Sequence, residues 1–151
     1  YGMKQKIHSL DDGDQLIFGE GRTITFAMTP YCHFIGSMVT YDHQTKTLFS
    51  SDAFGGFSDQ DNLYAGEHYA VQLETFLGEY LGSKRALEYA LKRVEQVAEL
   101  YGIELVCPQH GCVIPKEQIG EYLAFAHKLE VGGQIDGLAR KNGITLTSRD
   151  I

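Results

Sequence analysis

The sequence contains no apolar run that approaches the roughly 18–20 residues needed to span a bilayer. Residues 1–14, YGMKQKIHSLDDGD, also lack the apolar segment of a secretory signal peptide. Lysine and arginine form no cluster, and 13 basic against 20 acidic residues give a formal charge of −7. We therefore expect neither nucleic acid nor a membrane as a partner.

Cysteine is scarce, and the three residues present, Cys32, Cys107 and Cys112, cannot all pair with one another. In a chain without a signal peptide, an odd count favours reduced thiols and a cytoplasmic location. Internal repeats, low-complexity tracts and evident linkers are also missing. A length of 151 residues suits one domain, so residues 1–151 are expected to share one core.

Hydrophobic periodicity divides the chain into a first half of strands and a second half dominated by helices. Strands are predicted at residues 15–18, 23–28, 37–41, 47–51 and 103–108. Helices are predicted at residues 66–80, 84–100 and 116–130. The order indicates an α/β protein, in which the tyrosines are expected mostly to fill the core.

Three polar residues follow predicted strands at the point where each strand ends, namely His33, Asp52 and His110. Ligands of α/β folds tend to bind at the carboxyl ends of strands. Imidazole and carboxylate suit zinc or iron, and a carboxylate has two oxygens with which to bridge a metal pair. A histidine after a strand is nevertheless often a capping or core residue, so the pattern leaves a metal site and a structural role both open.

Residues 23–57, TITFAMTPYCHFIGSMVTYDHQTKTLFSSDAFGGF, resemble the second half of a metallo-β-lactamase-fold domain. Hydrolytic members of that superfamily would carry a GHTPGS-like stretch where this chain has CHFIGS. The run HFIGSMVTYD followed by LFSSDAFG instead resembles the diiron branch, which comprises flavodiiron proteins and oxygen-binding diiron proteins. The late motif of that branch, P-x-H-G, matches PQHG at residues 108–111. The similarity extends from about residue 12 to about residue 128.

The resemblance implies a fold, a cofactor and a ligand set. The fold would be the C-terminal half of an αββα sandwich, with strands and a hairpin followed by helices packed on the sheet. His33 would bind one metal, Asp52 would bridge two, and His110 would bind the other. The metals would be two non-haem iron ions, with zinc or manganese as alternatives, and the chemistry would be the binding, sensing or reduction of dioxygen.

The sequence departs from the family at its start, because the early H-x-E-x-D-H motif is missing and His8 stands alone. We therefore expect the chain to be the C-terminal part of one domain, whose N-terminal half is its partner on the same or a separate chain. An isolated half would expose apolar surface, which favours a homo-oligomer. The chain also has no FMN-binding segment.

Three alternatives remain open at this stage. The same fold with zinc or other metals could hydrolyse esters, thioesters or phosphodiesters. The chain could be a sensory module whose output domain follows Ile151, or a non-catalytic remnant that binds a partner. Phe34, Met38 and Phe54 are candidates for an apolar surround of the metals.

The remaining histidines and cysteines have simpler explanations than metal binding. Cys107 and Cys112 lack a second pair nearby, so a zinc site or redox pair is disfavoured. Cys107 is expected to be a small buried side chain, and Cys32 could reach a metal only as an extra ligand. Surface or capping roles are expected for His43, His68 and His127. The SDQD run at 58–61 is expected to be a solvated loop rather than a cation site.

Overall fold

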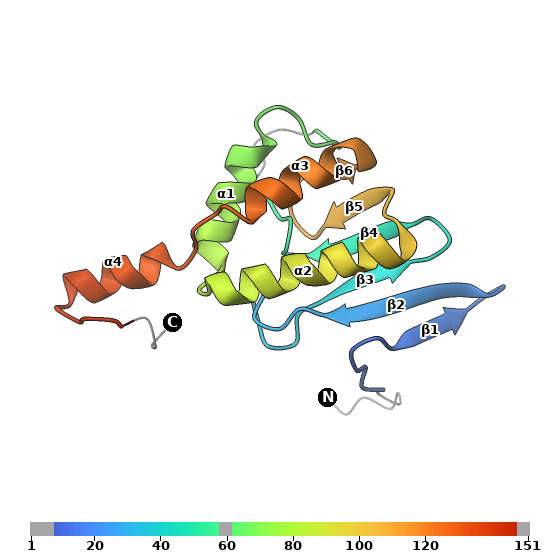
Figure 1. Cartoon of the computed structure of the whole chain (residues 1–151), viewed down its shortest axis with the longest axis horizontal. Helices are drawn as coiled ribbons and strands as arrows, with labels where there is room; N and C mark the ends of the chain where they lie inside the picture. Colours follow the sequence, from blue (N-terminus) through green and yellow to red (C-terminus); the bar gives the residue numbers. More distant parts are fainter. Residues whose placement is uncertain (1–7, 58–61, 148–151) are drawn as a thin grey trace, which may run out of the picture.

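The structure is a computed structural model that describes residues 8–57 and 62–147. Its centre is a sheet in which the strands lie side by side in the order of the sequence (Figure 1). The strands are β1 (Gln15–Phe18), β2 (Arg22–Met28), β3 (Met38–Asp42), β4 (Thr47–Ser51), β5 (Leu105–Pro108) and β6 (Ile114–Pro115). The helices are α1 (Tyr69–Tyr80), α2 (Lys84–Tyr101), α3 (Lys116–Ala126) and α4 (Gly133–Lys141). All neighbouring strands are antiparallel except β4 and β5, which are parallel.

An ion pair between Arg22 and the buried carboxylate of Asp42 stabilises the turn between β3 and β4. Asp42 accepts hydrogen bonds from Arg22, from the Thr45 hydroxyl at 2.7 Å and from the Gln44 amide at 3.1 Å. The Arg22 guanidinium, aided by these other donors, lowers the pKa of Asp42 to about 2. The carboxylate therefore remains charged although its side chain is inaccessible to solvent.

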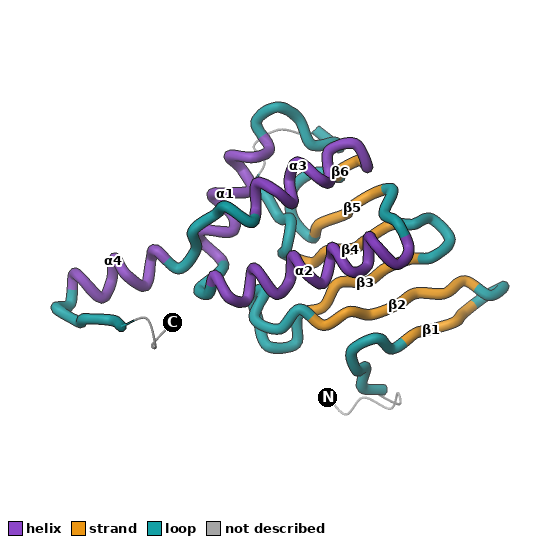
Figure 2. Tube along the Cα trace, viewed as in Figure 1, coloured by secondary structure: helices purple, strands orange, loops and turns teal. Residues whose placement is uncertain are grey.

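Helices α2 and α3 lie over one face of the sheet, and α1 packs next to them beyond the ends of β4 and β5 (Figures 1 and 2). Strand residues with alternating spacing point into this layer and are buried, namely Ala27, Val39, Tyr41, Leu48 and Val106. They meet apolar side chains of the helices, such as Leu73 and Phe76 of α1 and Leu87 and Leu91 of α2. Together these residues form the hydrophobic core.

The opposite face of the sheet is open. Met38, Thr40, Phe49 and Cys107 line a shallow groove there. Phe49 pairs with Thr40 on one side and Cys107 on the other, and its side chain is 47% exposed. The groove also contains polar side chains, but an exposed phenylalanine ring beside Met38 is typical of a sheet face that another layer covers.

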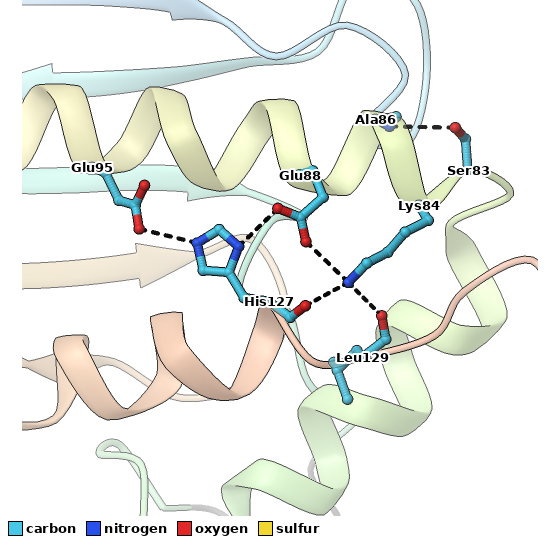
Figure 3. Close-up of polar contacts among 7 residues, drawn as sticks. All are labelled: Ser83, Lys84, Ala86, Glu88, Glu95, His127 and Leu129. Carbon is cyan, nitrogen blue, oxygen red and sulfur yellow. Dashed lines mark hydrogen bonds and ion pairs between the residues drawn. The ribbon is translucent and has the colours of Figure 1, made fainter.

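A polar cluster joins α2 to the end of α3 (Figure 3). The His127 ring lies between two carboxylates of α2, with Nδ1 2.9 Å from Glu88 and Nε2 3.0 Å from Glu95. The Lys84 ammonium donates at 2.7 Å to the carbonyl oxygens of His127 and Leu129 and pairs with Glu88 at 3.0 Å. The bonds from Lys84 provide partners for carbonyl groups at and after the C-terminal end of α3, where backbone acceptors are otherwise unpaired.

The elements agree with the sequence-based expectations except at a few boundaries. Helix α1 begins at Tyr69 rather than at residue 66, and α3 ends at Ala126 rather than at residue 130; β6 and α4 were not predicted. Helix α4 projects away from the sheet (Figure 1). Among the described residues, no helix combines the length and apolar character needed to cross a bilayer. The expectation that tyrosines mostly fill the core is wrong for the exposed Tyr31, Tyr64, Tyr80, Tyr89 and Tyr101.

Candidate metal centre

The sheet topology brings the three candidate ligands to one edge. Strands β2 and β4 run in the same direction because each is antiparallel to β3, and β5 is parallel to β4. Their carboxyl ends therefore lie at the same edge of the sheet. His33 lies in the loop after β2, Asp52 directly after β4, and His110 just after β5.

Each histidine faces a different oxygen of the same carboxylate. His33 Nε2 lies 3.9 Å from Asp52 Oδ2, and His110 Nε2 lies 4.0 Å from Asp52 Oδ1. Two ligand atoms that are each about 2.1 Å from a shared metal are at most about 4.2 Å apart. The spacing thus leaves room for one metal ion between each imidazole and its carboxylate oxygen.

Solvent access differs between these three side chains. Asp52 is 9% exposed, whereas His33 and His110 are 37% and 51% exposed. The carboxylate therefore lies at the base of the site and the imidazoles at its rim. No group of three or more His, Cys, Asp or Glu side chains in residues 8–57 and 62–147 is arranged around a single metal position. Each position between a histidine and Asp52 has two ligands from the described chain, fewer than iron or zinc requires.

Backbone hydrogen bonds fix the two loops that carry Asp52 and His110. The Gln109 amide donates to Ser51 at 2.9 Å, and the Gly56 amide donates to the His110 carbonyl at 3.1 Å. Ser51 has a φ of 52°, a left-handed conformation that is unusual for a residue with a side chain. It follows an irregularity in the β4–β5 pairing, so the chain turns sharply out of the sheet directly before Asp52.

Tyr69 connects the same two loops through a single hydroxyl group. It donates to the Phe54 carbonyl at 2.8 Å and accepts from the Cys112 amide at 3.3 Å. Burial raises the pKa of Tyr69, so the hydroxyl stays protonated and remains a donor. Gly111 approaches this hydroxyl so closely that an added Cβ would lie 2.5 Å from it, and its φ is 95°. A residue of α1 thereby sets the separation of the loops that carry Asp52 and His110.

Two stacked aromatic rings of α1 each lie against one of the imidazoles. The Phe76 ring stacks on the Tyr80 ring with centroids 4.5 Å apart. His110 lies 5.5 Å from Phe76, and His33 lies 5.5 Å from Tyr80. Gly55 allows this arrangement, since a Cβ there would lie 2.4 Å from the Phe76 ring. Sequence reasoning missed the roles of Tyr69, Phe76 and Tyr80, whose only signal was their helical spacing.

All three cysteines are free thiols. Burial, followed by the negative charge of Asp52, raises the pKa of Cys32 to about 12. Burial also raises the pKa of Cys107, which is half-buried at the end of β5. Cys112 is buried and its Sγ lies 3.2 Å from the Asn62 carbonyl oxygen. Burial disfavours the thiolate that a metal ligand or nucleophile requires at Cys32 and Cys107.

The other sequence candidates lie either beside this arrangement or away from it. His43 bonds to the Thr25 hydroxyl at 2.7 Å, and His68 is the exposed residue before α1. Phe34 is exposed but its ring lies 6.2 Å from that of His33, and the buried Phe54 contributes its carbonyl to Tyr69. Met38 lines the open sheet face instead. The SDQD run at 58–61 lies outside the described residues.

Comparison with known proteins supports the resemblance to diiron proteins. Residues 1–111 match a family model described as "ODP family beta lactamase". An uncharacterised protein of Methanocaldococcus jannaschii is 36% identical over 76% of the chain, which spans 28% of that protein. The anaerobic nitric oxide reductase flavorubredoxin of Klebsiella pneumoniae is 28% identical over 79% of the chain, which spans 26% of that protein.

A similar solved structure is described as "Peroxy diiron species of chemotaxis sensor ODP". It is 22% identical, with a TM-score of 0.73, over 83% of this chain and 54% of that one. This likeness shows the same fold, so the predicted α/β architecture of the metallo-β-lactamase type is confirmed. The chain spans about half of the length of the sensor and about a quarter of the length of the two curated relatives.

Proposed function

Since the chain belongs to the ODP beta-lactamase family, we propose that it forms one side of a non-haem diiron centre that binds, senses or reduces dioxygen. In this proposal His33 is a ligand of one iron, His110 is a ligand of the other, and Asp52 bridges the two. One observation carries the proposal: the two oxygens of one buried carboxylate each face a different imidazole, at 3.9 and 4.0 Å. A bridging carboxylate requires this arrangement.

The donor set fits the proposed metal. Neutral imidazole and carboxylate are ligands that non-haem iron accepts, and a bridging carboxylate offsets part of the charge of two divalent ions. When bound, the ferrous pair would supply the electrons that hold or reduce dioxygen. Asp52 would hold both ions, while Phe76 and Tyr80 would orient the imidazoles and exclude water from one side.

Each proposed metal position has only two ligands in the described chain, so further ligands must come from elsewhere. We propose that an N-terminal half of the domain, on the same or another chain, supplies them. The open sheet face around Phe49 is a suitable surface for it, because the half-exposed Phe49 and the neighbouring Met38 would be covered by a second sheet. Pairing of two copies through this face is the competing arrangement.

The named relatives favour oxygen-related chemistry over hydrolysis. One is named a nitric oxide reductase and another a chemotaxis sensor with a diiron species, and neither name describes a hydrolase. Reduction of nitric oxide and sensing of dioxygen are therefore both compatible with the proposed centre. A reductase would additionally need an electron donor, such as a flavin protein.

Iron analysis of matched variants tests the ligand assignment. The complete protein, purified under reducing and oxygen-free conditions, is expected to contain two iron ions and to change its optical spectrum on exposure to air. His110→Ala should lower the iron content to one or none, because it removes one of the few ligands on that side. Cys107→Ser and Cys112→Ser are the controls and should retain iron.

The opposite pattern would contradict the assignment. If the cysteine variants lost the metal and His110→Ala kept it, the ligands would be the thiols. If the complete protein held zinc, showed no optical change in air and cleaved an ester, the hydrolase alternative would replace the oxygen-binding function.

A further inference from the structure

A cavity of about 480 Å³ adjoins the candidate metal centre. Its walls come from the loop after β2 and from the first turns of α2, and its main lining residues are Pro30, Tyr31, His33, Arg85, Ala86 and Tyr89. Sites that enclose small organic ligands have volumes of about 300–1,000 Å³. The cavity is thus far larger than a diatomic gas requires.

The accessible surface of this cavity is mostly apolar, and two tyrosines belong to its lining. Tyr31 is 58% exposed and Tyr89 is 46% exposed, which leaves ring surface available to a ligand. Tyr31 is held in place by a left-handed backbone conformation, with a φ of 64°, and by a 2.8 Å bond from its amide to the Phe34 carbonyl. Rings of this kind favour a flat apolar ligand that can pack against them.

The cavity also carries one uncompensated positive charge. In residues 8–57 and 62–147 the Arg85 guanidinium has no hydrogen bond or ion pair, whereas Arg22 and Arg93 each pair with an aspartate. No carboxylate lines the cavity. A guanidinium with free donors binds a carboxylate with two parallel hydrogen bonds, a geometry that an ammonium group does not offer.

From these observations we propose that the cavity binds a small aromatic carboxylate, with its ring against Tyr31 and Tyr89 and its carboxylate on Arg85. This ligand would also contact the ring of His33, so an organic molecule would lie next to the metal centre. The inference goes beyond the proposed function, and it does not depend on the identity of the metal or on dioxygen.

Fluorescence titration with 1-naphthoate tests the proposal. The protein contains no tryptophan, so the emission of the bound naphthoate is free of the usual protein background. We expect saturable binding at one site, and weaker binding of the neutral 1-naphthalenemethanol. Arg85→Gln should weaken naphthoate binding about tenfold or more, since it removes a charge-assisted pair. Tyr89→Ala should also weaken it, through lost ring contact.

Lys92→Gln is the matched control, because it removes an exposed positive charge from α2 outside the cavity lining. It should leave the Kd within twofold of the parent, and circular dichroism should show all variants folded. The proposal is overturned if naphthoate does not bind, if the neutral alcohol binds equally well, or if Lys92→Gln matches Arg85→Gln. Repeating the titration after metal chelation separates this result from the proposed function, since the cavity should still bind naphthoate even if no iron site exists.

Discussion

Replacing Tyr69 by phenylalanine removes one oxygen atom that lies between the loops carrying Asp52 and His110. The ring is retained, together with its edge-to-face contact with Tyr122 at 5.5 Å. The change therefore leaves the core volume almost intact. Its effect should come from the two lost hydrogen bonds, to the carbonyl of Phe54 and from the amide of Cys112.

The two lost hydrogen bonds set the loss of unfolding free energy. Both backbone partners belong to buried residues, so they cannot be satisfied by bulk water after the substitution. A buried group left without a partner costs about 1–3 kcal/mol. The 2.8 Å bond should account for more of the loss than the 3.3 Å bond, and we expect Tyr69→Phe to lower the free energy of unfolding by about 2–3 kcal/mol.

Urea unfolding followed by circular dichroism measures this difference. Tyr122→Phe is a matched control, because its hydroxyl makes one longer bond, of 3.3 Å, to the Gly66 carbonyl. It should cost about 1 kcal/mol or less. Iron retention after desalting should fall for Tyr69→Phe and not for Tyr122→Phe. A Tyr69→Phe variant within about 0.5 kcal/mol of the parent would show that the hydroxyl does not hold the loops together.

Three further predictions follow from the fold. Gly111→Ala should lower the free energy of unfolding by more than about 2 kcal/mol, measured by thermal or urea unfolding. The reason is that φ is 95° and the new Cβ would lie 2.5 Å from the Tyr69 hydroxyl. Gly120→Ala in α3 is the control, because its Cβ meets nothing within 4 Å and should stabilise the protein slightly. Asp42 has a folded-state pKa of about 2, below the unfolded value of about 3.9. Its contribution to the stability of the fold is therefore present above about pH 4 and is lost as the pH falls toward 2. Arg22→Gln should accordingly raise the midpoint pH of acid unfolding, and an unchanged midpoint would refute the pairing. Lys84→Ala should lower the free energy of unfolding by about 2 kcal/mol, since its ammonium donates to two backbone carbonyls at 2.7 Å.

Periodicity identified the elements with strong patterns and failed for those without one. Helix α2 was predicted to within a residue because its apolar positions recur regularly and Ser83 caps it, its hydroxyl accepting from the Ala86 amide at 3.3 Å. Strand β6 has only two residues, which is too short to show alternation. Helix α4, GQIDGLARK, contains two glycines and few apolar residues, so its sequence gives a weak helical signal.

The candidate ligands could be predicted because each follows a strand and because the surrounding motifs resemble those of diiron proteins, but their supporting residues could not. Strand ends converge in a sheet of this topology, so His33, Asp52 and His110 could be grouped before any contact was known. The role of Tyr69 depends on a hydroxyl that reaches residues 15 and 43 positions away in the chain. A surface or capping role was expected for His127, which is the C-cap of α3, but the bonds of its ring to Glu88 and Glu95 of another helix could not be predicted. Contacts of this kind depend on packing rather than on local pattern.

The parallel pairing of β4 with β5 also has a consequence for the order of folding. Leu48 pairs with Val106, 106 − 48 = 58 positions away, and closing a loop of that length costs about 3.6 kcal/mol of chain entropy. Asp52 and His110 can approach each other only after that closure. Metal ions held between them would therefore bind late and contribute little to the folding rate, while slowing the reverse reaction. Loss of the proposed iron ions should therefore be seen as faster unfolding rather than as slower refolding.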